Sequence, residues 1–261
     1  MTEQAHVGAP VLEAENLSIQ FGGLKALQEL SFSIPEKTVF SIIGPNGAGK
    51  TTVFNMLTGV YQPTSGNISF EGRSIVGLKP YQVTQRGIAR TFQNIRLFSE
   101  LTVLENVKIA FHYHVKYGLI ESVLRIGRYF REEEAIEEES FKLLKIFHLE
   151  DKANEVAKNL PYGAQRRLEI ARALAAKPKL LLLDEPAAGM NPQETKELMD
   201  MIRWIRHEFG LTILLIEHDM SLVMGICERI YVLEYGEVIA QGTPDEIKQN
   251  PEVIRAYLGG E

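Results

Sequence analysis

The sequence has a single cysteine, no excess of positive charge and no long hydrophobic run, and each shortage excludes a class of protein. Cys227 cannot form an internal disulfide, and its apolar neighbours favour a buried structural thiol over a reactive one. A net charge of -6 at pH 7 argues against a protein whose main role is to bind nucleic acid, because binding to a phosphate backbone requires clustered Lys and Arg. We therefore expect no nucleic-acid partner.

The apolar runs are short. Those at residues 180–183 and 212–216 fall far below the roughly 18 to 20 residues that a membrane-spanning helix needs. Residues 1–10 are polar and lack the charge, apolar run and cleavage site of a secretory signal. We therefore expect a cytoplasmic chain that meets any membrane through partner proteins. Hydrophobic residues make up 45% of its 261 residues, which is typical of a globular protein with a sizeable core.

Short apolar segments alternate with helical patterns along most of the chain. Apolar and polar residues nearly alternate at 11–21 and 27–34, which predicts that a sheet begins at once. Buried strands are predicted at the apolar runs 39–43, 180–183 and 212–216. Helices are predicted before the last two of these strands, at 164–176 and 192–209. This order indicates an α/β fold with a mostly parallel, helix-covered sheet.

A mostly helical stretch interrupts this alternation. It predicts a helical subdomain, in which the acidic triplets 132–134 and 137–139 lie away from Ile136, Leu143 and Leu144. We interpret the triplets as a solvated helix face, and an acidic docking site is the alternative. We expect one domain over residues 1–261, divided into a catalytic sheet core at 11–89 and 177–241, a helical subdomain at 90–176, and short C-terminal helices within 242–261, at 244–249 and 251–258.

A glycine-rich loop follows the strand predicted at 39–43. The pattern G-x-x-x-x-G-K-[ST] is formed by Gly44, Pro45, Asn46, Gly47, Ala48, Gly49, Lys50 and Thr51, and Thr52 continues it into a helix. The glycines let backbone N–H groups curl around phosphate oxygens at the positive end of that helix. Lys50 is suited to neutralise the outer phosphates, and the Thr51 hydroxyl to ligate Mg²⁺. A purely structural turn is the alternative, and the strand–loop–helix context argues against it.

Two acids close the leucine strand at 180–183. Asp184 is expected at the carboxyl edge of the sheet, beside the phosphate loop, where it can hold Mg²⁺ through water. Glu185 is then placed to orient or deprotonate the water that attacks the γ-phosphate. The alternative is that the two acids merely cap a helix.

These motifs resemble the ATP-binding subunits of ABC transporters, and the resemblance covers nearly the whole chain. It implies the P-loop NTPase fold of ABC ATPases, with an N-terminal antiparallel sheet and an inserted helical subdomain. The family signature, L-S-G-G-Q before a basic helix, corresponds to residues 160–164. By this resemblance Tyr162, Gly163 and Ala164 cap the γ-phosphate of an ATP held by a facing subunit. Pro161, Tyr162 and Ala164 replace serine, glycine and glutamine, so only Gly163 keeps the backbone role.

Three single residues extend the resemblance. Gln93 is similar to the glutamine that senses Mg²⁺ and touches the membrane partner, His218 to the switch histidine on the γ-phosphate, and Phe21 to the aromatic residue that stacks on adenine. Taken alone, such residues are most often surface, capping or core residues. Their positions after the matching strands favour the functional interpretation. Residues 187–191 correspond to the stretch where two subunits of the family touch.

Longer stretches resemble the LivG-type ATPases of branched-chain amino acid importers. They are residues 21–26, 89–93, 184–192, 217–220 and 256–259, with an extended helical segment at 112–147. Such importers combine two ATPase subunits, two permease subunits and a periplasmic or extracellular substrate-binding protein. The resemblance therefore implies a second ATPase subunit in a heterodimer, with a homodimer as the alternative, held through permeases at the inner face of the membrane. The cofactors implied are ATP and Mg²⁺.

The implied reaction is transfer of a phosphoryl group to water, driven by positioning and charge neutralisation between two subunits closed head to tail. Thr51, Gln93 and Asp184 are the expected metal residues, and Lys50, Glu185 and His218 the catalytic ones. Three alternatives stay open: an ATPase of a related importer of urea or amides or of a lipopolysaccharide exporter, a soluble ABC ATPase without a transport role, and a P-loop kinase. Arg166 and Arg167 on the signature helix argue against the kinase.

Overall fold

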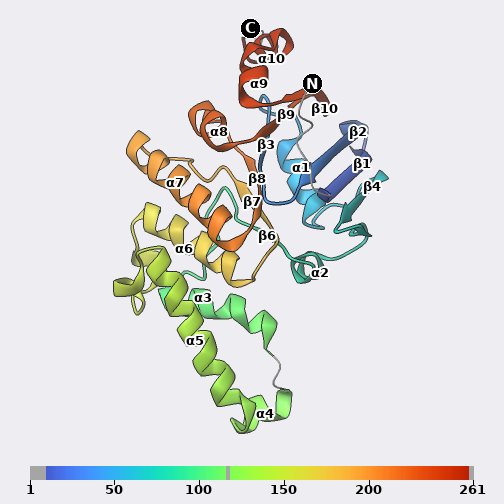
Figure 1. The fold of residues 1–261 in the computed structure, drawn as a ribbon. Helices are drawn as coiled ribbons and strands as arrows, with labels where there is room; N and C mark the ends of the chain where they lie inside the picture. Colours follow the sequence, from blue (N-terminus) through green and yellow to red (C-terminus); the bar gives the residue numbers. More distant parts are fainter. Residues whose placement is uncertain (1–9, 116–117, 259–261) are drawn as a thin grey trace, which may run out of the picture. The chain divides into compact units, whose positions relative to one another are not determined.

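A computed structural model describes residues 10–115 and 118–258 (Figure 1). The chain forms two compact units: the first contains the chain up to Arg90 and from Lys179 onward, and the second runs from Thr91 to Pro178. Within the described ranges, no helix has both the length and the hydrophobicity to span a bilayer.

The first unit is built on a six-stranded sheet. Its order is β10-β9-β3-β8-β7-β6, and the pairs between β9 and β6 are all parallel, while β10 is antiparallel to β9. The strands are β3 (Val39–Ile43), β6 (Ile88–Arg90), β7 (Leu180–Asp184), β8 (Thr212–Ile216), β9 (Arg229–Glu234) and β10 (Glu237–Gly242). Every residue of β3, β7 and β8 is buried, which explains their continuous apolar sequence. The predicted α/β fold with a mostly parallel sheet is confirmed.

The register of this sheet sets the level of its carboxyl edge. Ile42 of β3 and Asp184 of β7 both pair with Ile216 of β8. The end of β3, where the glycine-rich loop begins, is therefore level with Asp184, two strands away. In parallel sheets this edge is the common place for a ligand.

A second, antiparallel sheet belongs to the same unit and has the order β2-β1-β4-β5. Its strands are β1 (Pro10–Phe21), β2 (Leu24–Pro35), β4 (Ser65–Phe70) and β5 (Arg73–Ser74). Gly22, with φ +57°, allows the tight turn between β1 and β2. Leu12, Ile34 and Phe70 share one core with Phe54 of the helix after the loop. The predicted N-terminal antiparallel sheet is confirmed.

The helices of the first unit have clear start signals. They are α1 (Lys50–Leu57), α2 (Pro80–Gln85), α7 (Pro192–Phe209), α8 (Met220–Ile226), α9 (Pro244–Gln249) and α10 (Pro251–Leu258). Asn191 and Thr243 cap α7 and α9 with a side-chain oxygen, and a proline opens each first turn. The helices predicted at 192–209, 244–249 and 251–258 are confirmed.

In the described part of the second unit, all regular secondary structure is helical apart from one isolated bridge between Thr102 and Val156. Its α-helices are α3 (Val103–Phe111), α4 (Leu119–Leu124), α5 (Arg128–Ile146) and α6 (Tyr162–Ala175), and α3 packs against both α5 and α6. Ile136, Leu143 and Leu144 are buried on α5. Glu134, Glu137 and Glu138 are exposed on the same helix, as a solvated face requires. The start predicted for α6 at residue 164 is two residues late.

Candidate nucleotide-binding site

The loop of residues 44–49 depends on glycine at two crowded positions. Gly44 has φ +151°, and a Cβ there would lie 2.1 Å from the carbonyl oxygen of Leu233. Gly49 has φ +104°, and its Cβ would lie 2.7 Å from Cδ2 of Leu27. Gly47 has φ +82° with open space around it. Packing against the sheets therefore fixes the two ends of the loop, while Gly47 is required only by its backbone conformation.

Lys50 is the buried cation of this loop. Its ammonium donates to the carbonyl oxygens of Gly44 at 2.7 Å and Pro45 at 3.0 Å. Burial lowers the pKa of Lys50, and the negative charges of Glu185 and Asp184 oppose that shift. The loop is thus a ring of backbone groups with one positive charge held at its centre.

A cleft of about 600 Å³ opens over the loop. Among the residues that line it are Phe21, Asn46, Lys50, Thr51, Glu185 and His218. The structure therefore brings together residues predicted from four separate stretches of the chain. Tyr235, which sequence reasoning missed, lines the same cleft and is 83% exposed. Phe21 is 44% exposed and packs edge to face on Tyr61 with ring centroids 5.1 Å apart.

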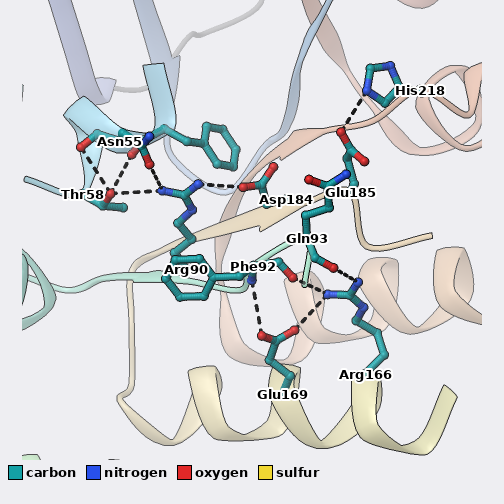
Figure 2. A network of polar contacts seen from close by, with 11 residues as sticks. Asn55, Thr58, Arg90, Phe92, Gln93, Arg166, Glu169, Asp184, Glu185 and His218 are labelled. Atoms are coloured by element: carbon teal, nitrogen blue, oxygen red, sulfur yellow. Dashed lines mark hydrogen bonds and ion pairs between the residues drawn. The ribbon is translucent and has the colours of Figure 1, made fainter. Parts of the chain in front are cut away.

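Asp184 lies at the end of β7 and is paired with an arginine that sequence reasoning also missed. Nη2 of Arg90 is 2.7 Å from Oδ2 of Asp184, and the two side chains are 6% and 7% exposed. Nη1 of Arg90 donates to Oδ1 of Asn55 at 2.8 Å and to Oγ1 of Thr58 at 3.3 Å (Figure 2). Arg90 therefore ties the end of α1 to the carboxylate expected to hold the metal.

Glu185 and His218 face each other across the ends of β7 and β8. Nε2 of His218 lies 2.9 Å from Oε1 of Glu185 (Figure 2). Glu185 has a left-handed backbone with φ +47°, and its N–H donates to the carbonyl of Ile216 at 2.9 Å. Such a conformation is strained for a residue other than glycine and is common at functional sites.

Glu217 connects the two loops that carry these residues. Its carboxylate is 4% exposed and accepts the N–H groups of Ala187 at 2.7 Å, His218 at 3.0 Å and Asp219 at 3.3 Å. Burial raises the pKa of Glu217, and the three backbone donors oppose that shift. Glu217 was not predicted, since one more acid beside His218 carries no signal in the sequence.

The other predicted residues lie in the second unit. Tyr162, Gly163 and Ala164 form the first turn of α6, with Pro161 as its N-cap residue. Pro161 provides no side-chain cap, so the sequence carries no oxygen that would have marked this start. Gln93 follows β6 by three residues, and its carbonyl accepts a hydrogen bond from Arg166 at 2.9 Å.

The donors at the cleft suit magnesium. Thr51 and Asp184 offer oxygen atoms, which Mg²⁺ prefers, and this ion usually takes one or two protein ligands together with phosphates and water. Across the described residues, no group of three or more His, Cys, Asp or Glu side chains could hold a metal ion. The donor set therefore fits a metal that binds together with a nucleotide.

Comparison with known proteins identifies the class. Residues 27–188 match the family model of the ABC transporter, and residues 237–261 match that of the branched-chain amino acid ATP-binding cassette transporter. A solved ATP-binding cassette of an ABC transporter in its ADP conformation is 33% identical, with a TM-score of 0.83 over 97% of this chain and 100% of that one. The chain belongs to the ATP-binding subunits of ABC transporters and is an ATPase of that family.

Relatives with higher sequence identity have more specific descriptions. The high-affinity branched-chain amino acid transport ATP-binding protein LivG of Salmonella typhimurium is 51% identical over 96% of this chain and 98% of its own length. BraF of Pseudomonas aeruginosa, which has the same description, is 48% identical over 96% and 98%. The lipopolysaccharide export system ATP-binding protein LptB of Haemophilus influenzae is 34% identical over 95% and 97%.

Proposed function

We propose that this chain is the ATP-hydrolysing subunit of an importer of branched-chain, hydrophobic amino acids. The match of residues 237–261 and the 51% identity to LivG support this cargo. The lower identity to LptB, 34%, argues against lipopolysaccharide export. Import of urea or short amides is the competing function within the same group.

One observation carries the catalytic part of the proposal: a single cleft is lined by Lys50, Thr51, Glu185 and His218. Backbone N–H groups of the loop bind the phosphates and Lys50 neutralises their outer charge, while the Phe21 ring stacks on the base. Glu185 orients the attacking water and accepts its proton, and His218 holds the γ-phosphate beside it. Thr51 and Asp184 would hold Mg²⁺, which would supply further charge neutralisation.

The catalytic site is completed by a second ATPase subunit. In a head-to-tail pair, the first turn of α6, with Tyr162, Gly163 and Ala164, caps the γ-phosphate of the ATP in the facing subunit. Gln93 touches the metal and the permease. The facing subunit is a related but different ATPase, and two permeases and a substrate-binding protein outside the membrane complete the importer. The chain works in the cytoplasm, held to the membrane by the permeases.

The test uses the assembled transporter. The tagged chain is purified from detergent-solubilised membranes, and we expect two permeases and a second ATPase to copurify. After reconstitution into vesicles, its ATPase rate is measured with substrate-binding protein loaded with leucine, isoleucine or valine, and then with urea or short amides. Stimulation by the amino acids alone supports the proposal, and stimulation by the amides alone contradicts the cargo but not the ATPase assignment.

A further inference from the structure

A buried ion pair lies near the start of α6. Arg166 and Glu169 are one helical turn apart, their side chains are 0% and 1% exposed, and Nη1 of Arg166 is 2.9 Å from Oε2 of Glu169. Burial of two charges is unfavourable unless further hydrogen bonds satisfy them. The other partners of this pair therefore identify what it holds in place.

Four of these bonds go to the main chain of residues 92–96, which we call the Gln93 segment. Arg166 donates to the carbonyls of Phe92 at 2.7 Å and Gln93 at 2.9 Å, and Oε1 of Glu169 accepts the N–H group of Phe92 at 3.3 Å (Figure 2). The same oxygen accepts the N–H group of Arg96 at 3.1 Å. Bonds to charged groups are stronger than neutral ones. Because the Gln93 segment, which is described in full, forms no helix or strand, these bonds fix its path along α6.

Tyr162 brings the signature segment, residues 160–164, into the same cluster. Its hydroxyl accepts a hydrogen bond from Nη2 of Arg166 at 3.2 Å, and its ring centroid is 5.9 Å from the guanidinium carbon. Nη2 is also the donor to the carbonyl of Gln93. One nitrogen atom therefore links the first residue of α6 to the Gln93 segment. The glycine that the common signature has at this position could make no such contact.

We propose that Arg166 is a positioning residue that couples the signature segment to the Gln93 segment, and that Tyr162 is the side chain through which the coupling passes. The inference rests on the proposed function for the contacts of the two coupled segments. The signature segment contacts the facing ATP, and Gln93 contacts the metal and the permease. Ordering of Tyr162 by the facing ATP then orders the main chain of Gln93. Displacement of the Gln93 segment by a permease loosens Tyr162 to the same extent, since coupling between two sites is reciprocal.

Hydrogen exchange of the full chain tests the coupling without any partner protein. Tyr162→Phe keeps the ring and removes only the acceptor oxygen. We expect the amides of Phe92 and Arg96 to exchange about two to five times faster than in the unmodified chain, the change in local opening that loss of one hydrogen bond produces. Arg166→Lys, which lacks the planar fork, should accelerate the same amides at least about tenfold. The Kd for ATP should stay within about twofold in Tyr162→Phe, because the phosphate loop belongs to the other unit.

Arg167→Lys is the matched control on the next residue of α6. In the described chain Arg167 makes no hydrogen bond to Phe92 or Gln93, so this variant should leave their exchange unchanged. Unaltered exchange of Phe92 and Arg96 in Tyr162→Phe overturns the proposal. If Arg166→Lys exchanges faster throughout α5 as well, the variant has lost its fold and Tyr162→Phe alone decides.

A second measurement separates coupling from a purely structural role. In the assembled transporter, Tyr162→Phe should lower kcat about two to five times and leave the KM for ATP within about twofold, because the lost bond acts on Gln93 and not on nucleotide affinity. A raised KM with unchanged kcat would instead mean that the Tyr162 hydroxyl serves nucleotide binding alone, without an effect on Gln93, and would overturn the coupling. The exchange experiment involves neither cargo nor permease, so its outcome is independent of the cargo assignment.

Discussion

The nucleotide cleft of the first unit and the Arg166 cluster of the second hold their polar groups by different means. In the cleft, backbone geometry fixes the site: crowded glycines shape the loop, and Glu185 has a left-handed backbone. In the cluster, two buried side chains hold an irregular main-chain segment. A loop shaped by glycines leaves its N–H groups for a ligand, whereas a segment held by an ion pair has its polar groups already satisfied. The first arrangement suits binding and the second suits transmission of movement.

The largest expected effect is on the chemical step in the cleft. Glu185→Gln should keep the affinity for ATP within about threefold and lower the hydrolysis rate by roughly 10² to 10⁴, because the amide cannot accept the proton of the attacking water. The measurement is phosphate release by the assembled ATPase pair, with ATP binding measured on the same sample. Turnover at the unmodified rate would remove Glu185 from the role of base.

Substitutions in the Arg166 cluster should change the stability of the protein. Arg166→Met leaves the charge of Glu169 buried without its partner and should lower the free energy of unfolding by about 3 to 5 kcal/mol. Adding Glu169→Leu should restore only part of this, because four main-chain groups of the Gln93 segment still lack partners. Both variants are compared by urea unfolding. Full recovery in the double variant would mean that the ion pair does not hold the segment.

Two glycines of the loop allow a matched comparison. Gly44→Ala places a Cβ 2.1 Å from a carbonyl oxygen and should cost about 3 kcal/mol of unfolding free energy. Gly47→Ala meets no atom within 4 Å and should cost about 1 to 2 kcal/mol, for its left-handed φ alone. Thermal unfolding of the two variants checks the order. Equal losses of unfolding free energy would show that close packing at Gly44 does not determine the conformation of the loop.

The smallest expected effect concerns the rim of the cleft. Phe21→Ala should weaken ATP binding about fivefold, since stacking on a base is worth about 1 kcal/mol. Tyr235→Ala should weaken it about twofold at most, because Tyr235 is the more exposed of the two. Titration with a fluorescent ATP analogue measures both. A greater loss of ATP affinity in Tyr235→Ala than in Phe21→Ala would place the adenine base nearer the turn between β9 and β10.

Sequence predicts this fold best where local signals are strong. The strands β3, β7 and β8 are continuous apolar runs, and α7 and α9 have a cap and a first-turn proline. No range was predicted for five strands, β4, β5, β6, β9 and β10, although a strand was expected before Gln93. Of these, β5 and β6 have only two and three residues. Strands this short depend on pairing with distant neighbours, which a local pattern does not contain.

The residues of the candidate site also differ in how well the sequence predicts them. The phosphate loop and the acids after β7 are contiguous motifs, so the sequence predicts that they meet, although their roles in binding and catalysis remain predictions. Arg90 pairs with Asp184 because β6 lies parallel to β7, a register that no sequence pattern encodes. In the sequence Arg166 and Glu169 resemble ordinary charges on an amphipathic helix, and only the structure shows that they are buried and bonded to the main chain of the Gln93 segment.

The chain crosses between the units at two peptide bonds, after Arg90 and after Pro178. Both crossings enter neighbouring strands of one sheet, since β6 ends at Arg90 and the N–H of Lys179, just before β7, donates to the carbonyl of Gly87 at 2.8 Å. Because β6 and β7 are parallel, the two crossings lie at opposite ends of this strand pair. The chain leaves the first unit directly after Arg90, the residue that binds Asp184 at the end of β7, so the outgoing crossing begins beside that carboxylate.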